Sequence, residues 1–268
     1  SPLSPLSPLL SNIVLDELSE ELGVTEFVIN DAYEAEFVAI PGEQLGMYRI
    51  PDYKYSPDGK IIVGDNGLPV EGDKILIGSS VPDYNMSLTN TLRYKQFRLS
   101  VLFDYQKGGL MYSNTANATF WSGNSEQSTV NDRRPYLIPN TVIEVKDDEG
   151  NTTGYQENTI PVYNNWHDYY NSNTNKPIAQ NRIIEKTYLK LRELSLSYRL
   201  KPSVLDKTFL SAANISFFGR NLFLWTPADN SYIDPETTTW DNDIQGMFGE
   251  FNGAPSVRTY GVKLDVTF

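Results

Sequence analysis

The sequence predicts an all-β fold of antiparallel strands, and two observations carry this prediction. First, apolar and polar residues alternate in several stretches, such as "TYGVKLDVTF" at 259–268. Alternation places successive side chains on opposite sides of an extended chain, so each strand has one apolar and one polar face. Second, short turns and long polar segments alternate as the connections between these stretches. The apolar face must meet either a protein core or a lipid bilayer.

Composition excludes several classes of protein. The chain of 268 residues carries 34 acidic and 22 basic side chains, and its net charge of -12 would repel nucleic acid and anionic membrane surfaces. It contains no cysteine, which excludes disulfides, a thiolate nucleophile and a cysteine-ligated zinc site. The sequence has no run of about 18 apolar residues, so no transmembrane helix is expected.

The beginning of the sequence differs from the rest. Residues 1–12, starting "SPLSPLSPLL", predict a Pro-rich linker or a poorly ordered end. They lack the basic and apolar regions of a secretory signal peptide, and we do not expect them to be one. Residues 13–22, "IVLDELSEEL", fit either one or two helical turns or the end of a strand.

Strand patterns begin near residue 25. The stretches "TEFVI", "EAEFVAI" and "GEQLGMYRI" predict short strands, and "SPDGK" predicts a turn before "IIV". The clearest pattern is a pair of long strands, at 84–94 and 97–105. Their apolar faces consist of Tyr84, Met86, Leu88, Leu92 and Tyr94, and of Phe97, Leu99, Val101, Phe103 and Tyr105. Because only Lys95 and Gln96 separate the two strands, we expect a tight hairpin.

The following residues, up to about Arg182, show no periodicity and are rich in Asn, Ser, Thr, Tyr and Gly. We expect a long loop here, which a compact soluble domain seldom contains. Periodicity returns in "TYLKLRELSLSYRL" at 187–200, where the apolar phase switches at Arg192 and Glu193 and predicts a β-bulge. The helix formers in this stretch leave a helix as the alternative.

The last two strands are predicted at 214–225, "NISFFGRNLFLW", and at 259–268, with a second long polar loop between them. Long loops at one end of the strands and short turns at the other are typical of an outer-membrane β-barrel. Aromatic residues also lie near strand ends, as in the girdles of such barrels, namely Tyr84, Tyr94, Phe97, Tyr105, Tyr188, Tyr198, Trp225, Tyr260 and Phe268. A β-sandwich explains the alternation equally well, but not the unequal loops.

Several blocks between about 41 and 268 resemble one family. "GRNLFLWT", "YIDPET" and "APSVRTYGVKLDVTF" resemble the C-terminal end of SusC/RagA-type TonB-dependent transporters of the Bacteroidetes outer membrane. "GEQLGMYRI", "ILIGSSVPDYNMSLTNTLRYKQFRLSVLFDYQKGG" and "KTYLKLRELSLSYRLKPSVLD" resemble earlier parts of the same barrels. The resemblance implies an all-β fold whose antiparallel strands form the C-terminal part of a transmembrane outer-membrane β-barrel with long extracellular loops.

The resemblance also implies a function. Residues 13–268 would be a C-terminal barrel segment whose plug and N-terminal strands are not in this chain, and which imports an oligosaccharide or a peptide without catalysis or a cofactor. The implied partners are the remaining plug and barrel portion, a SusD-like surface lipoprotein, the TonB complex and outer-membrane lipid, but not nucleic acid. The C-terminus would be periplasmic, and Phe268 would match the aromatic signal for barrel assembly.

Candidates for enzyme chemistry are few. The only histidine, His167, lies in "NNWHDYY", and we expect a solvated side chain rather than a metal ligand or general base. The carboxylates permit a glycosidase pair, but no spacing selects one. The acidic stretch "DNSYIDPETTTWDND" could bind calcium, although it lacks the pattern of an EF-hand. We predict no catalytic residue and no metal site.

Loop aromatics are the better candidates for binding, because flat rings stack on sugars and pack against proteins. The substrate-binding or lid-contact candidates are Tyr112, Trp121, Trp166, Tyr169, Tyr170 and Trp240. Alternatively, these rings pack the loops against one another. The residues expected to face the lumen are Arg98, Asp104, Arg220, Lys263 and Asp265. Two other functions stay open, a secreted all-β glycan-binding module and an autotransporter-like anchor.

Overall fold

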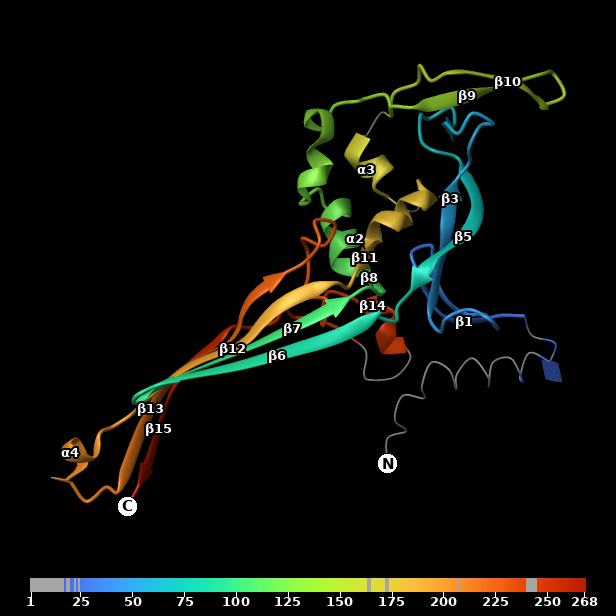
Figure 1. Cartoon of the computed structure of the whole chain (residues 1–268). Helices are drawn as coiled ribbons and strands as arrows, with labels where there is room; N and C mark the ends of the chain where they lie inside the picture. The colour runs from blue at the N-terminus through green and yellow to red at the C-terminus, as the bar shows by residue number, and fades with distance from the viewer. Residues whose placement is uncertain are drawn as a thin grey trace. The chain divides into compact units, whose positions relative to one another are not determined.

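The computed structural model describes residues 17, 20–21, 23, 25–162, 165–171, 174–206, 208–239 and 245–268. The predicted linker at 1–12 and most of the stretch 13–22 lie outside the described residues. The chain divides into two compact units. We call residues 82–109, 185–237 and 254–268 the sheet unit, and the rest of the described chain the mixed unit. Figure 1 labels their helices and strands.

The sheet unit is one five-stranded antiparallel sheet with the order β15-β13-β12-β7-β6. Its strands are β6 (Tyr84–Tyr94), β7 (Phe97–Lys107), β12 (Tyr188–Arg199), β13 (Ala212–Trp225) and β15 (Thr259–Thr267). Each strand coincides with a stretch of alternating sequence, and the prediction of an all-β fold with antiparallel strands is confirmed. Within the described residues the sheet is open, with β6 and β15 as its edges.

The predicted hairpin and bulge are both confirmed. Tyr94 lies opposite Phe97 across the hairpin of β6 and β7, and the turn places Lys95 at a φ of 55°. In β12 the register against β7 shifts between Leu191 and Glu193, so Arg192 is the extra residue of the bulge. The alternative of a helix in this stretch is wrong, because β12 pairs along its length with β7 and β13. A short helix, α4 (Pro202–Leu205), lies in the connection from β12 to β13.

The mixed unit contains three small sheets. The strands of the first are β1 (Phe27–Ala32), β2 (Ala35–Ala39), β3 (Met47–Tyr53) and β5 (Glu71–Ser79), and those of the second are β4 (Ile61–Val63), β9 (Thr141–Lys146) and β10 (Thr152–Glu157). The third combines β8 (Leu110–Ser113), β11 (Ile183–Glu185) and β14 (Gly249–Glu250).

Short helices complete the mixed unit. They are α2 (Asn114–Trp121), η1 (Glu126–Arg133), α3 (Asn165–Tyr169), η2 (Lys176–Arg182) and η3 (Gln245–Met247). Throughout the described ranges, no helix has the length and apolar character needed to cross a membrane.

The long connection predicted after β7 is present, since β7 ends at Lys107 and β12 begins at Tyr188, but the expectation that it lacks regular structure is wrong. Its described residues form strands and helices that belong to one compact unit with the described residues up to 81 and between 238 and 253. The apolar residues in this stretch are too sparse to give a periodic pattern, but many of them are buried, among them Phe120, Val142 and Ile178. Their partners lie far away in the sequence, and a local pattern cannot reveal such contacts.

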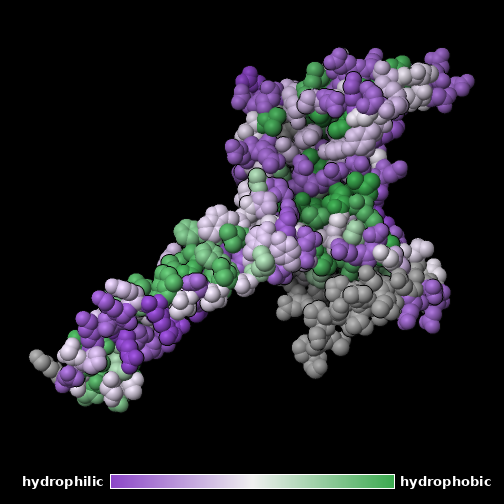
Figure 2. Space-filling view, viewed as in Figure 1, coloured by the Kyte–Doolittle hydropathy of each residue, from purple (hydrophilic) through white to green (hydrophobic). Residues whose placement is uncertain are grey.

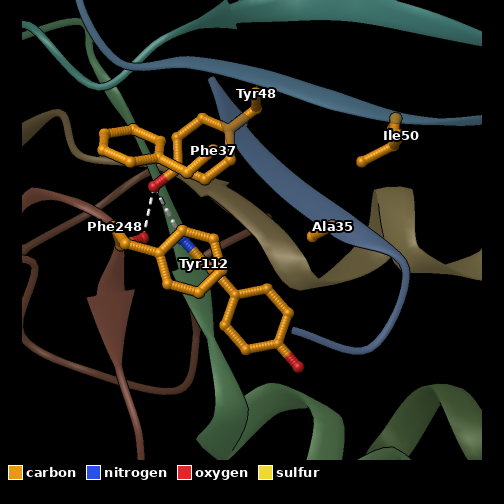
Figure 3. Close-up of a cluster of buried hydrophobic side chains, with 6 residues drawn as sticks. All are labelled: Ala35, Phe37, Tyr48, Ile50, Tyr112 and Phe248. Atoms are coloured by element: carbon orange, nitrogen blue, oxygen red, sulfur yellow. Dashed lines mark hydrogen bonds between the residues drawn. The ribbon is translucent and has the colours of Figure 1, made fainter. Parts of the chain in front are cut away.

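An aromatic cluster forms the core of the mixed unit (Figure 3). Its buried members are Ala35, Phe37, Tyr48, Ile50, Tyr112 and Phe248. The rings of Tyr112 and Phe248 are stacked with their centroids 5.3 Å apart. The Tyr48 hydroxyl donates a hydrogen bond to the Phe248 carbonyl oxygen, which also accepts one from the Tyr112 amide at 2.9 Å. The cluster thus ties β2, β3 and β8 to the segment at 238–253.

Truncating this cluster should destabilise the mixed unit. We expect Phe248→Ala to lower the free energy of unfolding by about 3–5 kcal/mol, since it removes a fully buried ring and leaves a cavity. Pulse proteolysis of the purified protein across a urea gradient measures this change. Tyr55→Ala removes a half-exposed ring from the same unit and should shift stability by no more than about 0.5 kcal/mol. Equal urea midpoints for the two variants would contradict the central role of the cluster.

Candidate functional site

The sheet unit has one apolar face that runs across all of its strands. The register aligns apolar side chains in rows, for example Leu92, Leu99, Leu196, Phe217 and Val262. These side chains are not covered, and Leu88, Phe217 and Val262 are 63%, 58% and 65% exposed. Figure 2 shows hydrophobic and hydrophilic side chains gathered in separate zones of this sheet. So large an exposed apolar surface marks a site of contact with protein or membrane.

Aromatic rings lie at both ends of the apolar face. Tyr84 and Tyr105 are neighbours at one end, with centroids 6.0 Å apart, and Phe97 and Tyr198 at the other, with centroids 4.8 Å apart. Tyr84 and Tyr94 bound β6, so the rings are separated by about 33 Å along the strand. At a strand tilt of roughly 40°, this length gives a height of about 25 Å, which equals the apolar band of outer-membrane barrels.

The opposite face of the sheet is polar and rich in charge pairs. The register places Asp104, Arg220, Lys263 and Asp265 on this face, together with Arg98. Arg220 lies 3.0 Å from Glu193, and Lys263 lies 2.7 Å from Asp265. All the residues predicted to face a lumen therefore share the face that is opposite the apolar one.

A buried charge network fastens the connection after β13 to this polar face. Lys190 of β12 is only 2% exposed, and its ammonium nitrogen lies 2.6 Å from an oxygen of Asp234 and also contacts Glu236. Arg192 and the Tyr188 hydroxyl both donate hydrogen bonds to Glu236. Asp234 and Glu236 are the acids of the "YIDPET" block, which gives that block a structural role.

The network also lowers the pKa of Glu236. Burial by itself raises the pKa of Glu236, but hydrogen bonds from Arg192 and Lys190 outweigh it and lower the pKa to about 2. Glu236 therefore stays ionised down to strongly acidic pH. Because its pKa is depressed on folding, the stability that it contributes is present above its ordinary pKa and is lost as the pH falls toward 2.

The mixed unit contains a cavity of about 230 Å³. It is lined by Tyr33, Asn114, Asn117, Ala118, Trp121, Asn171 and Arg182. Trp121 is 57% exposed at this cavity, and its ring centroid lies 6.4 Å from that of His167. Amide groups beside an open aromatic ring suit a ligand that carries both flat apolar faces and hydrogen-bonding groups.

Helix α2 presents much of this lining. Ser113 caps the helix and accepts a hydrogen bond from the Ala116 amide at 3.1 Å. The fully buried Glu250 accepts hydrogen bonds from the Ser113 hydroxyl at 2.6 Å and from the Thr115 amide at 2.8 Å. A carboxylate at this helix end is favourable, because the first amides of a helix lack partners. With the start of α2 fixed, the spacing of Asn114, Asn117 and Trp121 places all three on one side.

Arg182 is the cation of the cavity. It is buried, and one terminal nitrogen donates a hydrogen bond to the Tyr170 carbonyl oxygen. Within the part of the chain that the structure describes, its Nε and Nη1 have no hydrogen-bond partner. Burial lowers the pKa of the guanidinium to about 10. The residue therefore remains charged at neutral pH in surroundings that satisfy it only in part.

The predicted binding aromatics have different surroundings. Trp121 is the exposed one at the cavity, whereas Tyr112 lies in the aromatic cluster and Tyr170 is buried against Phe120, with ring centroids 4.8 Å apart. Tyr169 meets Tyr170 edge-on at 5.0 Å. Trp240 and the side chain of Trp166 lie outside the described residues.

The remaining candidates and the residues that sequence reasoning missed can also be placed. Phe268 is exposed and stacks on Phe209, with centroids 5.7 Å apart. Asn114, Asn117 and Arg182 were not predicted as site residues. The helical spacing within "NTANATFW" was an available signal for the two asparagines, but no local pattern points to Arg182.

Comparisons with known proteins agree with this architecture. No protein-family model matches the chain. TonB-dependent receptor P3 of Formosa agariphila is 25% identical over 226 residues, covering 79% of this chain and 19% of that protein. TonB-dependent receptor P26 of the same organism is 25% identical over 208 residues, which cover 76% of this chain and 19% of that protein. The chain thus spans about a fifth of the length of these curated relatives.

Solved structures show a similar fold. A structure of the RagAB peptide importer in the closed-closed state matches 92% of this chain and 25% of its own, with a TM-score of 0.55 and 14% identity. A structure of the RagAB peptide transporter matches the same shares, with a TM-score of 0.54 and 15% identity. The resemblance seen in the sequence is therefore confirmed, in that this chain is similar in sequence to part of two TonB-dependent receptors and similar in fold to part of the RagAB structures.

The Lys190 network generates a prediction. We expect Lys190→Met to weaken the attachment of residues 226–237 by about 3–5 kcal/mol, because it leaves the buried carboxylate of Asp234 without its cation. Limited proteolysis of the folded protein, with mass spectrometry of the cleavage sites, reports this as faster cutting within 226–237.

The matched control is Lys263→Met, which breaks an exposed salt bridge. It should change the free energy of local opening by less than about 1 kcal/mol, and so the cleavage rate only slightly. The double variant K190M/D234N should recover part of the protection, because it removes the unpaired charge as well. Unchanged cleavage in K190M would show that the network does not hold this segment.

Proposed function

We propose that this chain is part of an outer-membrane transporter of the SusC/RagA type and that its five-stranded sheet spans the membrane. The apolar face would contact lipid, and the polar face would line the interior of a barrel completed by the rest of the transporter. The observation that carries the proposal is the continuous exposed apolar face of the sheet, bounded by aromatic rings, opposite a face rich in ion pairs.

Connections between the strands support an orientation. β6 and β7 are joined by Lys95 and Gln96 alone, while residues 108–187 join β7 to β12 and residues 226–258 join β13 to β15. In outer-membrane barrels the short turns are periplasmic and the long connections extracellular. We therefore assign the hairpin end of β6 and β7 to the periplasm and the long connections at 108–187 and 226–258 to the outer surface of the cell.

We further propose an oligomeric nutrient, a glycan or a peptide, as the cargo, and the cavity at Trp121 as a place where it binds. Import would proceed without chemical change, and both curated relatives are named receptors. The two similar solved structures are of a peptide importer or transporter, which supports a peptide. A SusD-like lipoprotein over the outer surface and the TonB complex on the periplasmic side complete the proposal.

The proposed placement of the sheet predicts unequal effects of one substitution on its two faces. Val101→Arg places a charge in the middle of the apolar face, and should cost about 2–4 kcal/mol at the bilayer midplane. Ser100→Arg is the matched control, since the neighbouring side chain points to the polar face and can stay in water.

The measurement is the amount of folded transporter in outer-membrane fractions, from semi-native gels run with and without boiling. We expect V101R to reduce the heat-sensitive band strongly and S100R to leave it nearly unchanged. If the protein is instead water-soluble and unaffected by boiling, the sheet is not membrane-spanning. The alternative of a secreted glycan-binding module would then be favoured.

The proposed cargo site yields a second prediction. Trp121→Ala should weaken cargo binding about fivefold, corresponding to roughly 1 kcal/mol for a stacked ring. Calorimetric titration of the purified transporter with a panel of peptides and oligosaccharides measures the change. Tyr155→Ala removes an exposed ring from β10, which does not line the cavity, and should leave the affinity unchanged. Equal affinities for wild type and W121A would exclude this contact.

A further inference from the structure

A group of basic side chains lies at the hairpin end of the sheet unit. We define the basic cluster as Arg93, Lys95, Arg98, Arg199 and Lys201. Together with Ser197 and Asn214, these residues line an open hollow of about 720 Å³. Arg93 and Arg98 lie directly opposite each other in the register of β6 and β7. The cluster occurs in a chain whose net charge is -12, so general composition does not account for it.

The basic cluster differs from the rest of the polar face. Elsewhere on that face Lys190 pairs with Asp234, Arg192 with Asp104, and Arg220 with Glu193. Among the described residues, no carboxylate forms a salt bridge with any member of the basic cluster. Lys95 instead lies over the ring of Tyr94, 5.3 Å from its centroid. Asp265, which the register places opposite Asn214, forms its salt bridge with Lys263 and not with the cluster. The sheet therefore pairs charges over much of its polar face but leaves the basic cluster without salt bridges among the described residues.

Unpaired like charges in this arrangement have an energetic cost. Like charges directly opposite each other on neighbouring strands are destabilising, which applies to Arg93 and Arg98. An anionic partner would remove this repulsion, and the planar guanidinium groups are suited to bidentate binding of carboxylates. The register places Arg93, Arg98 and Arg199 on the face opposite the apolar one, away from a lipid headgroup beside the apolar face.

We propose that the basic cluster docks an acidic segment of polypeptide, one that carries at least two carboxylates. The inference rests on the proposed function in one respect, since it places this segment in the part of the transporter outside this chain. The chain covers only 19% of the length of its curated relatives, so much of such a protein is available to supply it. Side chains of that segment then occupy the hollow, where Asn214 and Ser197 can form hydrogen bonds with them.

Zero-length carbodiimide coupling tests the proposal in outer-membrane vesicles that contain the full-length transporter. The reagent joins an amine only to a carboxylate in direct contact, and mass spectrometry identifies both residues. We expect Lys95 or Lys201 to be joined to an Asp or Glu of an acidic segment. The internal positive control is the pair of Lys54 and Glu144, which lie 2.8 Å apart within this chain.

Lysine acetylation in the same vesicles gives a second readout. Docking should make Lys95 and Lys201 react at least tenfold more slowly than they do in the R93Q/R98Q variant, in which the lysines are intact but the segment is released. Lys60, which is half-exposed and forms a salt bridge with the nearby Asp58, should react equally in both proteins.

Two results would overturn the proposal. One is full acetylation of both lysines with no cross-link while the control pair is joined. The other is protection that disappears when detergent removes lipid, again with no peptide cross-link, which would identify a phospholipid headgroup as the occupant. Either result in a heat-sensitive membrane protein rejects only the docking, whereas a water-soluble protein rejects the proposed function itself.

Discussion

The register of backbone hydrogen bonds across the sheet unit is the constraint on which its surface chemistry depends. Side chains alternate between faces along a strand, so a shift by one residue in any pair would move a whole strand's apolar set to the other face. In β12 the apolar phase itself changes, and the bulge at Arg192 restores it. This one extra residue keeps Leu189 and Leu194 on the same face. The apolar surface is therefore continuous across the five strands.

The mixed unit differs from the sheet unit because it forms a buried core although its sequence is mostly polar. Its apolar side chains are few, and they gather from three distant segments around Tyr48, Tyr112 and Phe248. Backbone groups also link these segments, since the Phe248 carbonyl oxygen accepts hydrogen bonds from the Tyr48 hydroxyl and the Tyr112 amide. Gly249 is required beside it, because a Cβ there would lie 2.0 Å from the Tyr112 carbonyl oxygen. Segments that look like loops are thereby held as a scaffold for the cavity.

How much could be predicted from sequence follows from the range of each interaction. The faces of the strands, the hairpin and the bulge depend on neighbouring residues, and alternation revealed them. The aromatic cluster, the cap on α2 by Glu250 and the pairing of Lys190 with Asp234 join residues far apart in sequence, and no local pattern encodes them. Tyr112 was a candidate for contact with substrate or a lid because it lies in a stretch expected to be an extracellular loop, yet its partners in the core lie on other segments.

The lengths of the connections also explain how charge is distributed over the polar face. The long connection after β13 folds back over β12 and brings its own acids, so Lys190 and Arg192 are paired within the chain. At the other end, β6 and β7 are joined by two residues, too few to fold back over the sheet. The short α4 connection nearby leaves Arg199 and Lys201 without salt bridges among the described residues. Short turns therefore leave the basic cluster without salt bridges among the described residues, and the unequal connections on which the proposed orientation rests also support the proposed partner at this end.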